Sequence, residues 1–351
     1  MISFPEPINR ILVTGGSGFI GGTLVRRLLK ESSHKVFNLN KLGYASNLEV
    51  VNDEFDLNRY QLINIDLANK EDTKNAIDFI DPDIVFHLAA ESHVDKSILG
   101  PRIFLEANMI GTFNLLESVV PHWESLASSR KDSFRFIHVS TDEVFGSLGP
   151  IGLFSEDSPY KPSSPYSATK AASDHLVKSW FQTYGLPTII TNSSNNFGAW
   201  QLPEKLIPVI IINAISKKNI PIYGDGKNIR DWIYVEDHID ALIKVALNGI
   251  VGDSYCIGAN QEKSNEEIVE IICELLDRHN SINSPHNRFK SYVEDRKGHD
   301  RRYAINNKKI IADLGWYPKH NFIQAMSSTV KWYLENIDWC NKSLLNYQIN
   351  K

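Results

Sequence analysis

The chain has 351 residues and a formal net charge of −5 at pH 7, with 42% hydrophobic and 23% charged residues. This composition is that of a globular protein and excludes wholesale disorder, collagen and coiled coil. The negative balance excludes a broad basic surface for nucleic acid or anionic membrane. The length predicts two domains, or one large α/β domain with an appended lobe.

The three cysteines, Cys256, Cys273 and Cys340, include no C-x-x-C pair, which argues against a disulfide framework or a zinc site. The N-terminus lacks a signal-peptide pattern, and the longest apolar run, near residues 207–215, is too short to span a bilayer. We therefore expect a cytoplasmic protein with no membrane or nucleic-acid partner and no bound metal.

Short apolar runs alternate with helical patterns in the first half of the chain, which predicts βαβ units. Strands are expected at 10–14, 35–39, 61–65, 83–88, 134–140 and 188–191, and later helices at 204–216, 265–277 and 322–334. The predicted fold is α/β, a doubly wound parallel Rossmann sheet with a smaller α/β C-terminal substrate lobe. We place the first domain at 1–195 and the second lobe at 196–351, with elements exchanged near 230–260 and 305–320, and the ligand in the cleft between them.

A glycine-rich turn follows the first predicted strand and precedes a helical stretch. Gly15, Gly18 and Gly21 form G-x-x-G-x-x-G, whose missing side chains allow a tight turn and close approach to a pyrophosphate. The strand and helix on either side favour dinucleotide binding over a turn without a ligand. After the second strand, Asn40 occupies the position where an acidic residue usually hydrogen-bonds the cofactor's ribose. Asn can still bind a ribose hydroxyl, so NAD is expected, but no carboxylate is present to repel the 2′-phosphate of NADP. Asp66 either reaches the adenine or caps a helix.

Tyr166 and Lys170 are four residues apart in P-Y-S-A-T-K, so they share one face of a predicted helix. An ammonium beside a phenol lowers the phenol's pKa and makes Tyr166 a base for hydroxyl protons. Alone, the pair could equally lie on a surface helix. Asp142 and Glu143 follow Thr141 at the end of the fifth strand, where a ligand crevice lies. Two acids with opposite duties suit an elimination, although a solvated turn would carry the same residues.

The chain resembles the dTDP-glucose 4,6-dehydratases of the extended short-chain dehydrogenase/reductase superfamily, within the NAD-dependent epimerase/dehydratase family. The resemblance covers nearly the whole length and includes T-G-G-S-G-F-I-G-G, S-T-D-E-V-F-G, S-S-P-Y-S-A-T-K and I-R-D-W-I-Y-V-E-D-H. It implies a lyase with tightly bound, recycled NAD, which converts dTDP-glucose to dTDP-4-dehydro-6-deoxy-D-glucose and water. The resemblance also implies a homodimer.

The resemblance implies roles for named residues. Tyr166, with Thr141 and Lys170, would deprotonate the C4 hydroxyl as hydride passes to NAD, Glu143 would take the C5 proton, and Asp142 would protonate the departing C6 hydroxyl. The implied cofactor-binding residues are Gly15, Gly18, Phe19, Ile20, Gly21, Asn40, Lys41, Leu42, Asp66, Leu67, Leu88, Ala89, Ala90, Ser92, Ala107, Tyr166, Lys170 and Asn196. The implied substrate-binding residues are Ser92, Thr141, Asn195, Lys205, Leu206, Pro221, Ile222, Tyr223, Arg230, Asn265, Asp295, Arg296, Lys297, Gly298 and His299.

The guanidinium groups of Arg230 and Arg296 can bind a diphosphate through paired hydrogen bonds, although surface ion pairs would use the same residues. Departures from the family pattern include Asn40 for Asp, Ala107 for Thr and Lys297 for Pro, and none of them touches the catalytic set. Three alternatives stay open: a dehydratase of UDP-glucose, a UDP-sugar 4-epimerase that leaves the two acids unused, and a catalytically silent NAD-binding protein. Thymine and uracil differ by one methyl group, so the base preference is not predicted.

Overall fold

A computed structural model of the chain describes residues 2, 4–52 and 55–349. Within them, the main sheet has seven parallel strands in the order β10-β6-β5-β4-β1-β2-β3. Their bounds are β1 Arg10–Thr14, β2 Lys35–Asn40, β3 Tyr60–Asn64, β4 Ile84–His87, β5 Arg135–Thr141, β6 Thr188–Ser193 and β10 Ser254–Ile257. The predicted fold class is confirmed, and the six predicted strands lie within one or two residues of those observed.

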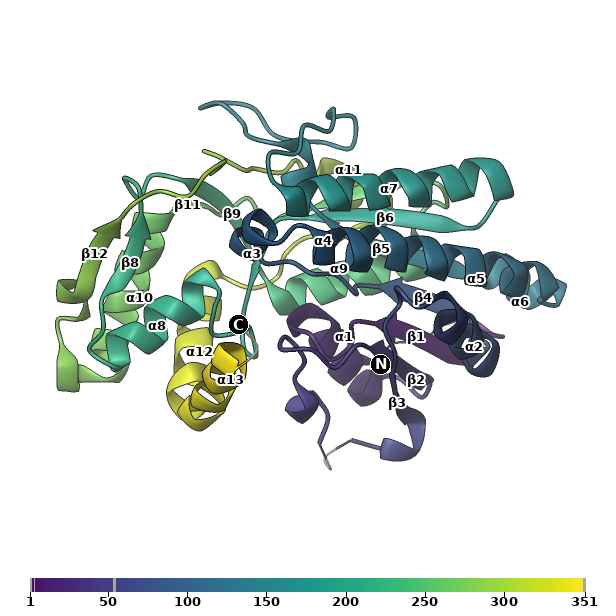
Figure 1. Cartoon of the computed structure of the whole chain (residues 1–351), viewed down its shortest axis with the longest axis horizontal. Helices are drawn as coiled ribbons and strands as arrows, with labels where there is room; N and C mark the ends of the chain where they lie inside the picture. Colours follow the sequence, from purple (N-terminus) through teal and green to yellow (C-terminus); the bar gives the residue numbers. More distant parts are fainter. Residues whose placement is uncertain (1, 3, 53–54, 350–351) are drawn as a thin grey trace.

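Helices cover both faces of the sheet, as Figure 1 shows. On one face lie α1 Phe19–Glu31, α9 Val235–Asn248 and α11 Lys308–Leu314, whose apolar residues share a core with β1 and β4. On the other face lie α2 Lys70–Ile80, α5 Gly111–Ser125 and α7 Pro165–Tyr184, which pack against β2, β4, β5 and β6. Both faces are therefore buried, which explains the near-continuous apolar runs of the strands.

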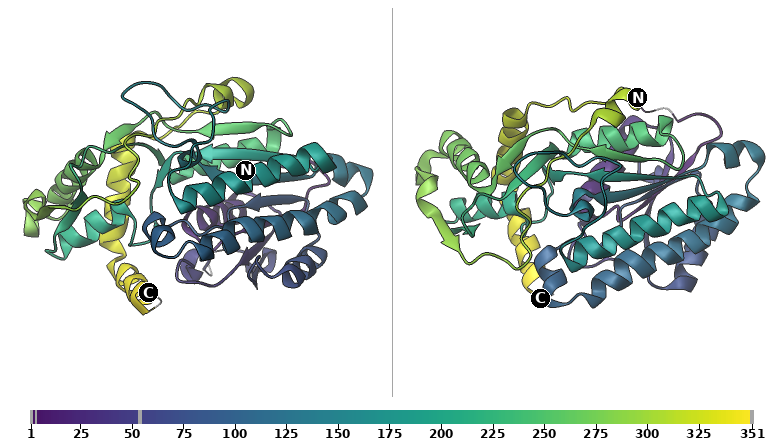
Figure 2. Two further views of the ribbon diagram at one scale, coloured as in Figure 1. Left: turned by 45° about the horizontal axis from the view of Figure 1, so that its top comes forward. Right: turned by 90° about the horizontal axis from the view of Figure 1, so that it is seen from above.

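Shorter helices and turns connect these layers. They are α3 Val94–Leu99, α4 Arg102–Phe104 and α6 Ser128–Ser133, the π-helix η3 Leu105–Ile110, and the 3-10 helices η1 Leu48–Val50, η2 Leu57–Arg59 and η4 Asp142–Phe145. The π-helix leads directly into α5, and in Figure 2 α5 and α7 run side by side along the sheet. Sequence patterns did not predict η3 or η4, because a one-residue change in hydrogen-bond spacing leaves no trace in apolar periodicity.

A second lobe surrounds a separate apolar core. It contains the helices α8 Leu206–Ile215, α10 Asn265–His279, α12 Phe322–Glu335 and α13 Ile337–Ile349, and the 3-10 helices η5 Ser281–Asn283 and η6 His286–Phe289. Its strands are β7 Asn195–Phe197, β9 Ile229–Tyr234 and β11 Glu262–Ser264 in one sheet, and β8 Ile220–Tyr223 with β12 Lys290–Val293 in another. The chain returns from this lobe to the main sheet through α9, β10 and α11.

Candidate active site

A cavity opens at the carboxyl ends of the main sheet's strands, where β1, β2, β4 and β5 terminate. The predicted catalytic residues Thr141, Asp142, Glu143, Tyr166 and Lys170 all line it. So do the predicted cofactor residues Gly15, Gly18, Phe19, Ile20, Gly21, Asn40, Lys41, Asp66, Leu67, Leu88, Ala89, Ala90, Ser92, Ala107 and Asn196, and the predicted substrate residues Asn195 and Lys205. Segments far apart in sequence thus meet at one edge of the sheet, as expected for a doubly wound fold.

The glycine turn between β1 and α1 packs closely against neighbouring backbone, which is possible only because side chains are missing. Gly15 has φ +72°, and a Cβ there would lie 2.8 Å from the Ala89 backbone. A Cβ on Gly21 would collide with the Gly15 carbonyl. Gly18 is the N-cap of α1 and brings no capping side chain, so the first N–H groups of this helix face the cavity edge with a positive dipole end. The turn fits a dinucleotide pyrophosphate.

The end of β2 offers an amide where a carboxylate was expected. Asn40 Oδ1 accepts from the Ser17 backbone N–H at 3.3 Å, and its Nδ2 donates to the Lys41 carbonyl and Ser46 Oγ, both at 2.8 Å. Lys41 forms an ion pair with Asp66 at 3.0 Å. Asp66 caps no α-helix, because Asn69 is the N-cap of α2; that alternative was wrong. Asp66 instead lines the cavity.

The two acids are positioned by the turn that ends β5. Thr141 is the N-cap of η4: its Oγ1 accepts from the Glu143 backbone N–H at 3.2 Å and donates to Asp142 Oδ1 at 3.3 Å. Asp142 is almost fully buried, and its Oδ2 has no hydrogen-bond partner within the described part of the chain. Glu143 keeps part of its surface exposed. One short turn therefore presents a buried acid and a more accessible one to the same cavity.

Tyr166 and Lys170 lie in the first turns of α7. Pro165 starts this helix, and Ser164 forms a capping box with Ser167, so the helix start is firmly set. The Lys170 Nζ donates to the Val139 carbonyl of β5 at 3.0 Å. Both side chains are buried. The surface-helix alternative for this pair was wrong.

Burial dominates the electrostatics of the acids. It raises the pKa of Asp142 well above its usual value, and the neighbouring Glu143 and Asp231 add to this. The pKa of Glu143 is also raised by burial, but Arg296, Arg230 and Lys205 counteract that increase. Asp142 therefore favours the protonated form, whereas Glu143 faces three cations that favour its carboxylate.

The expectation that the pKa of Tyr166 falls below its usual value was wrong for this structure. Burial and the charge of Glu143 raise the Tyr166 pKa instead. Burial also lowers the pKa of Lys170 to about 8, although Asp174 counteracts this decrease. The reason is that both side chains have lost water, and the ammonium of Lys170 is bound to a strand carbonyl.

Cations from the second lobe meet this edge of the sheet. Lys205 is the N-cap of α8, and its Nζ donates to the Ser92 carbonyl at 3.0 Å. Arg230 lies in β9, is 5% exposed, and stacks over the Tyr303 ring at 4.4 Å. Arg296 forms an ion pair with Asp95 of the sheet domain at 3.7 Å. These cations suit an anionic group held between the two lobes.

The remaining predicted residues lie outside the cavity lining: Leu42, Leu206, Pro221, Ile222, Tyr223, Asn265, Asp295, Lys297, Gly298 and His299, together with Arg230 and Arg296. His299 Nδ1 pairs with Asp295 Oδ1 at 2.6 Å. Its ring is roughly perpendicular to the Tyr223 ring, with the two ring centroids 6.5 Å apart. The Ile222 side chain is buried in the core of the second lobe, so it faces away from a ligand. Leu42 is 40% exposed.

Other residues line the cavity that the sequence did not single out as ligand contacts, among them Leu39, Gly43, Tyr44, Ala45, Ser46, Ile65, Glu91, Val139, Ser140, Ser193, Ser194, Gln201 and Leu202. Residues 43–46 follow shortly after β2, and this position at the carboxyl edge of the sheet is the sequence signal that could have identified them as cavity-lining residues. No sequence signal identified Gln201 and Leu202. Over the described residues, no cluster of His, Cys, Asp or Glu suited to a metal ion is found.

Comparisons with known proteins agree with this arrangement. Residues 12–329 match the GDP-mannose 4,6 dehydratase family. The chain is 48% identical to the dTDP-glucose 4,6-dehydratase of Salmonella typhimurium over 95% of this chain and 94% of that protein. It is 49% identical to that of Haemophilus influenzae over 93% and 98%.

Solved structures give the same picture. A dTDP-glucose 4,6-dehydratase from Bacillus anthracis in complex with NAD has a TM-score of 0.83 at 40% identity, over 96% of this chain and 99% of that one. The enzyme of the same name from Streptomyces venezuelae, with NAD bound, has a TM-score of 0.86 at 37% identity, over 95% and 99%. A UDP-glucose 4-epimerase from Thermus thermophilus has a TM-score of 0.82 at 26% identity, over 93% and 99%.

Proposed function

The chain belongs to the GDP-mannose 4,6-dehydratase family, and from that premise we propose that it is an NAD-dependent dTDP-glucose 4,6-dehydratase, a hydro-lyase that acts on a nucleotide sugar. The observation that carries the proposal is the position of Asp142 and Glu143 beside Tyr166 in one cavity. A 4-epimerase has no use for these two acids, whereas an elimination needs one proton donor and one proton acceptor.

The first step concerns the C4 hydroxyl of glucose. Tyr166, as the phenolate that the Lys170 ammonium stabilises, takes this proton and becomes a neutral phenol, with Thr141 as a hydrogen-bonding partner. Bound NAD would supply the hydride acceptor for C4 and later the donor for C6, so no external reductant is consumed. The glycine turn and the other cavity-lining residues of the predicted cofactor set would hold it.

The second step removes water. The 4-ketone acidifies the C5 proton, Glu143 takes that proton, and Asp142 gives its own to the departing C6 hydroxyl. The unequal electrostatic surroundings of the two acids support this division, because Glu143 and Asp231 strengthen the effect of burial on Asp142, while Arg296, Arg230 and Lys205 oppose it at Glu143. When the hydride returns to C6, Glu143 gives a proton back to C5, which yields dTDP-4-dehydro-6-deoxy-D-glucose. Tyr166 then releases its proton to solvent and Asp142 takes one up, so the protein ends in its starting protonation state.

The diphosphate of the substrate would lie between Arg230, Arg296 and Lys205, which meet near the sheet edge from the second lobe. Ser92, Asn195 and the segment 295–299 complete the proposed substrate contacts. Arginine suits this task because its planar guanidinium binds phosphate oxygens in pairs.

We also propose a cytoplasmic homodimer. The segment Arg102–Ser125 is long and apolar enough to cross a membrane by length and composition, but 44% of its apolar window is buried within the protein and it packs against α2 and α7. Its outer side exposes Ile103, Leu105 and Ile110 by nearly half, which supports a second copy as its cover. Sedimentation at micromolar concentration should give twice the chain mass; a monomer would contradict the dimer.

Product analysis tests the function directly. Purified protein given dTDP-glucose and UDP-glucose without added reductant should convert the dTDP sugar to a product lighter by one water. Dehydration of UDP-glucose alone would favour the UDP-sugar dehydratase, and an epimerised sugar of unchanged mass would favour the epimerase. Turnover of neither substrate would contradict the proposed function.

A further inference from the structure

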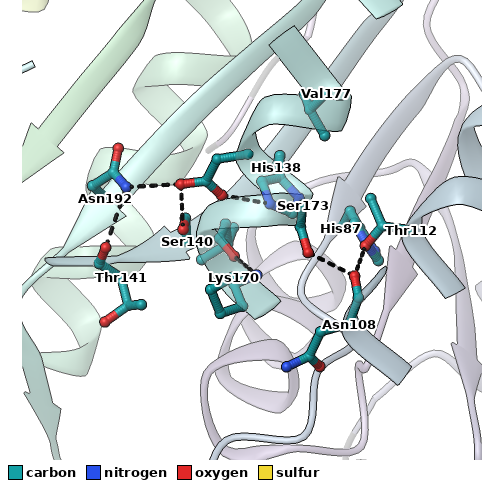
Figure 3. Close-up of polar contacts among 12 residues, drawn as sticks. His87, Asn108, Thr112, His138, Ser140, Thr141, Lys170, Ser173, Val177 and Asn192 are labelled. Atoms are coloured by element: carbon teal, nitrogen blue, oxygen red, sulfur yellow. Dashed lines mark hydrogen bonds and ion pairs between the residues drawn. The ribbon is translucent and has the colours of Figure 1, made fainter. Parts of the chain in front are cut away.

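A buried carboxylate lies behind the active site, outside the cavity lining. Asp174 is on α7, one turn after Lys170, and is 2% exposed. It accepts four hydrogen bonds: from His138 Nε2 at 3.0 Å, Ser140 Oγ at 2.8 Å, Tyr160 Oη at 2.9 Å and Asn192 Nδ2 at 3.2 Å. Figure 3 shows the partners on β5 and β6 converging on one carboxylate group.

These donors keep Asp174 ionised. Burial alone would raise its pKa, but the hydrogen bond from His138 and the charge of Lys170 outweigh burial, so the pKa is lowered. Burial lowers the pKa of His138 to about 4, so the imidazole is neutral and donates through Nε2. Burying a charge costs free energy unless it is fully hydrogen-bonded, and here both carboxylate oxygens have partners.

The network reaches the catalytic turn through the backbone. Asn192 uses the same Nδ2 to donate to the Thr141 carbonyl at 3.2 Å, and Ser140 directly precedes Thr141. Lys170 donates to the carbonyl of Val139, the next residue back. Asp174 and Lys170 together therefore hold the last three residues of β5, immediately before the two acids.

Asp174 also provides negative charge for Lys170. The two residues are four positions apart on one helix face, and Asp174 is the group that keeps the Lys170 pKa from falling further. The other titratable groups around the pair are His87 of β4 and His138 of β5, both with lowered pKa values, and Tyr160 and Tyr166, both with raised pKa values. None of these carries charge near neutral pH.

We propose that Asp174 is a positioning residue for the dehydratase reaction: it holds the end of β5 in place through Asn192 and Ser140, and it keeps Lys170 charged beside Tyr166. This role rests on the proposed function, since it acts through residues of that site. Apolar packing of the core does not need the hydrogen-bond network around Asp174, whereas this positioning role does.

The test compares Asp174→Asn with a matched control, Asp83→Asn. Asp83 is also buried and accepts from two backbone N–H groups at 2.8 Å and from Arg130 Nε at 2.7 Å, but at the amino end of β4, away from the cavity. Both variants should lower Tm. Only Asp174→Asn should move the basic limb of the kcat/KM profile to lower pH, by about one unit, because loss of a nearby negative charge lowers the Lys170 pKa.

Asn192→Ala separates the two parts of the role. It removes the link to the Thr141 carbonyl but leaves the Asp174 charge, so kcat should fall about tenfold with KM for dTDP-glucose unchanged and the basic limb in place. This variant also decides the matter if Asp174→Asn does not accumulate as folded protein.

A pH profile of Asp174→Asn that superimposes on the wild type, or an unchanged kcat in Asn192→Ala, would overturn the proposal. The wild type is assayed in the same series, with product mass as the readout. A wild type that dehydrates no nucleotide sugar would overturn the proposed function itself, which separates the two failures.

Discussion

At the scale of single residues, burial decides which groups hold protons. Asp142 and Glu143 are adjacent in the chain and burial raises the pKa of both, but two carboxylates add to the increase at Asp142 while three cations oppose it at Glu143. Adjacent acids with different surroundings can serve as acid and base in one turnover. The sequence indicated the pair and its duties, but the difference in surroundings comes from Arg230, Arg296 and Lys205, which arrive from distant segments.

Glu143→Gln should remove the base while keeping the shape of the turn. We expect kcat for dehydration to fall about 10²- to 10⁴-fold, the usual worth of a general base, with NAD retained. Exchange of the C5 proton with deuterated solvent, followed by mass spectrometry, measures the step. Glu117→Gln is the control: this carboxylate lies on α5, is paired with Lys70 at the start of α2 and lies outside the cavity lining, so the variant should behave as wild type. Unchanged C5 exchange in Glu143→Gln would remove this residue from the mechanism.

The lowered pKa of Lys170 predicts a loss of activity on the basic side of the pH profile. Its pKa is lowered to about 8, so the stabilising ammonium is present below that pH and is lost as the pH rises through it. kcat/KM should therefore fall above about pH 8, while Lys170→Met should show low activity without that limb. A wild-type profile that stays flat to pH 10 would contradict the assignment. Steady-state kinetics across the range provides the measurement.

At the scale of elements, local signals explain most of what the sequence predicted. The strands of the first half were found because both faces are buried and their apolar runs are continuous. The join of β10 to β6 was not identified, since four residues whose pairing partners lie over 60 positions away carry no local signature. The Asp174 network was missed for the same reason: His138, Asn192 and Asp174 meet only after three elements have packed.

The start of α7 sets the position of Tyr166, so its cap should matter for catalysis. Ser164→Ala should lower the free energy of unfolding by about 0.5–2 kcal/mol and also lower kcat, because the first turn carries Tyr166. Asn321→Ala removes the N-cap of α12, outside the cavity, and should cost similar stability with kcat unchanged. Equal kcat values for the two variants would show that the cap has no catalytic consequence. Denaturant titration and initial rates supply both quantities.

At the scale of the whole molecule, both lobes contribute to the site, and the chain enters the second lobe three times, at β7, β11 and α12. The sheet domain supplies the glycine turn and the acids, and the second lobe supplies Lys205, Arg230 and Arg296. The family resemblance anticipated these residues, but their convergence near Glu143 comes from the packing of the second lobe against the sheet domain. A ligand that contacts both lobes should stabilise the whole fold.

Binding of dTDP should therefore raise Tm. At a hundred times its Kd the expected stabilisation is about 2.7 kcal/mol, and Arg296→Ala should remove most of it by taking away a diphosphate contact. Arg278→Ala, a surface arginine paired with Glu274 on α10, should keep the full shift. Differential scanning fluorimetry with dTDP measures both variants. A full shift in Arg296→Ala would contradict the diphosphate role.

In the proposed reaction, a hydride moves from C4 to C6 of the sugar while the cofactor returns to its starting state. The most direct measurement uses dTDP-glucose deuterated at C4 in ordinary water, with the product analysed by mass spectrometry and NMR. We predict that the deuterium appears at C6 of the 4-dehydro-6-deoxy product. Deuterium lost to solvent, or retained at C4 of an epimerised sugar, would contradict the account.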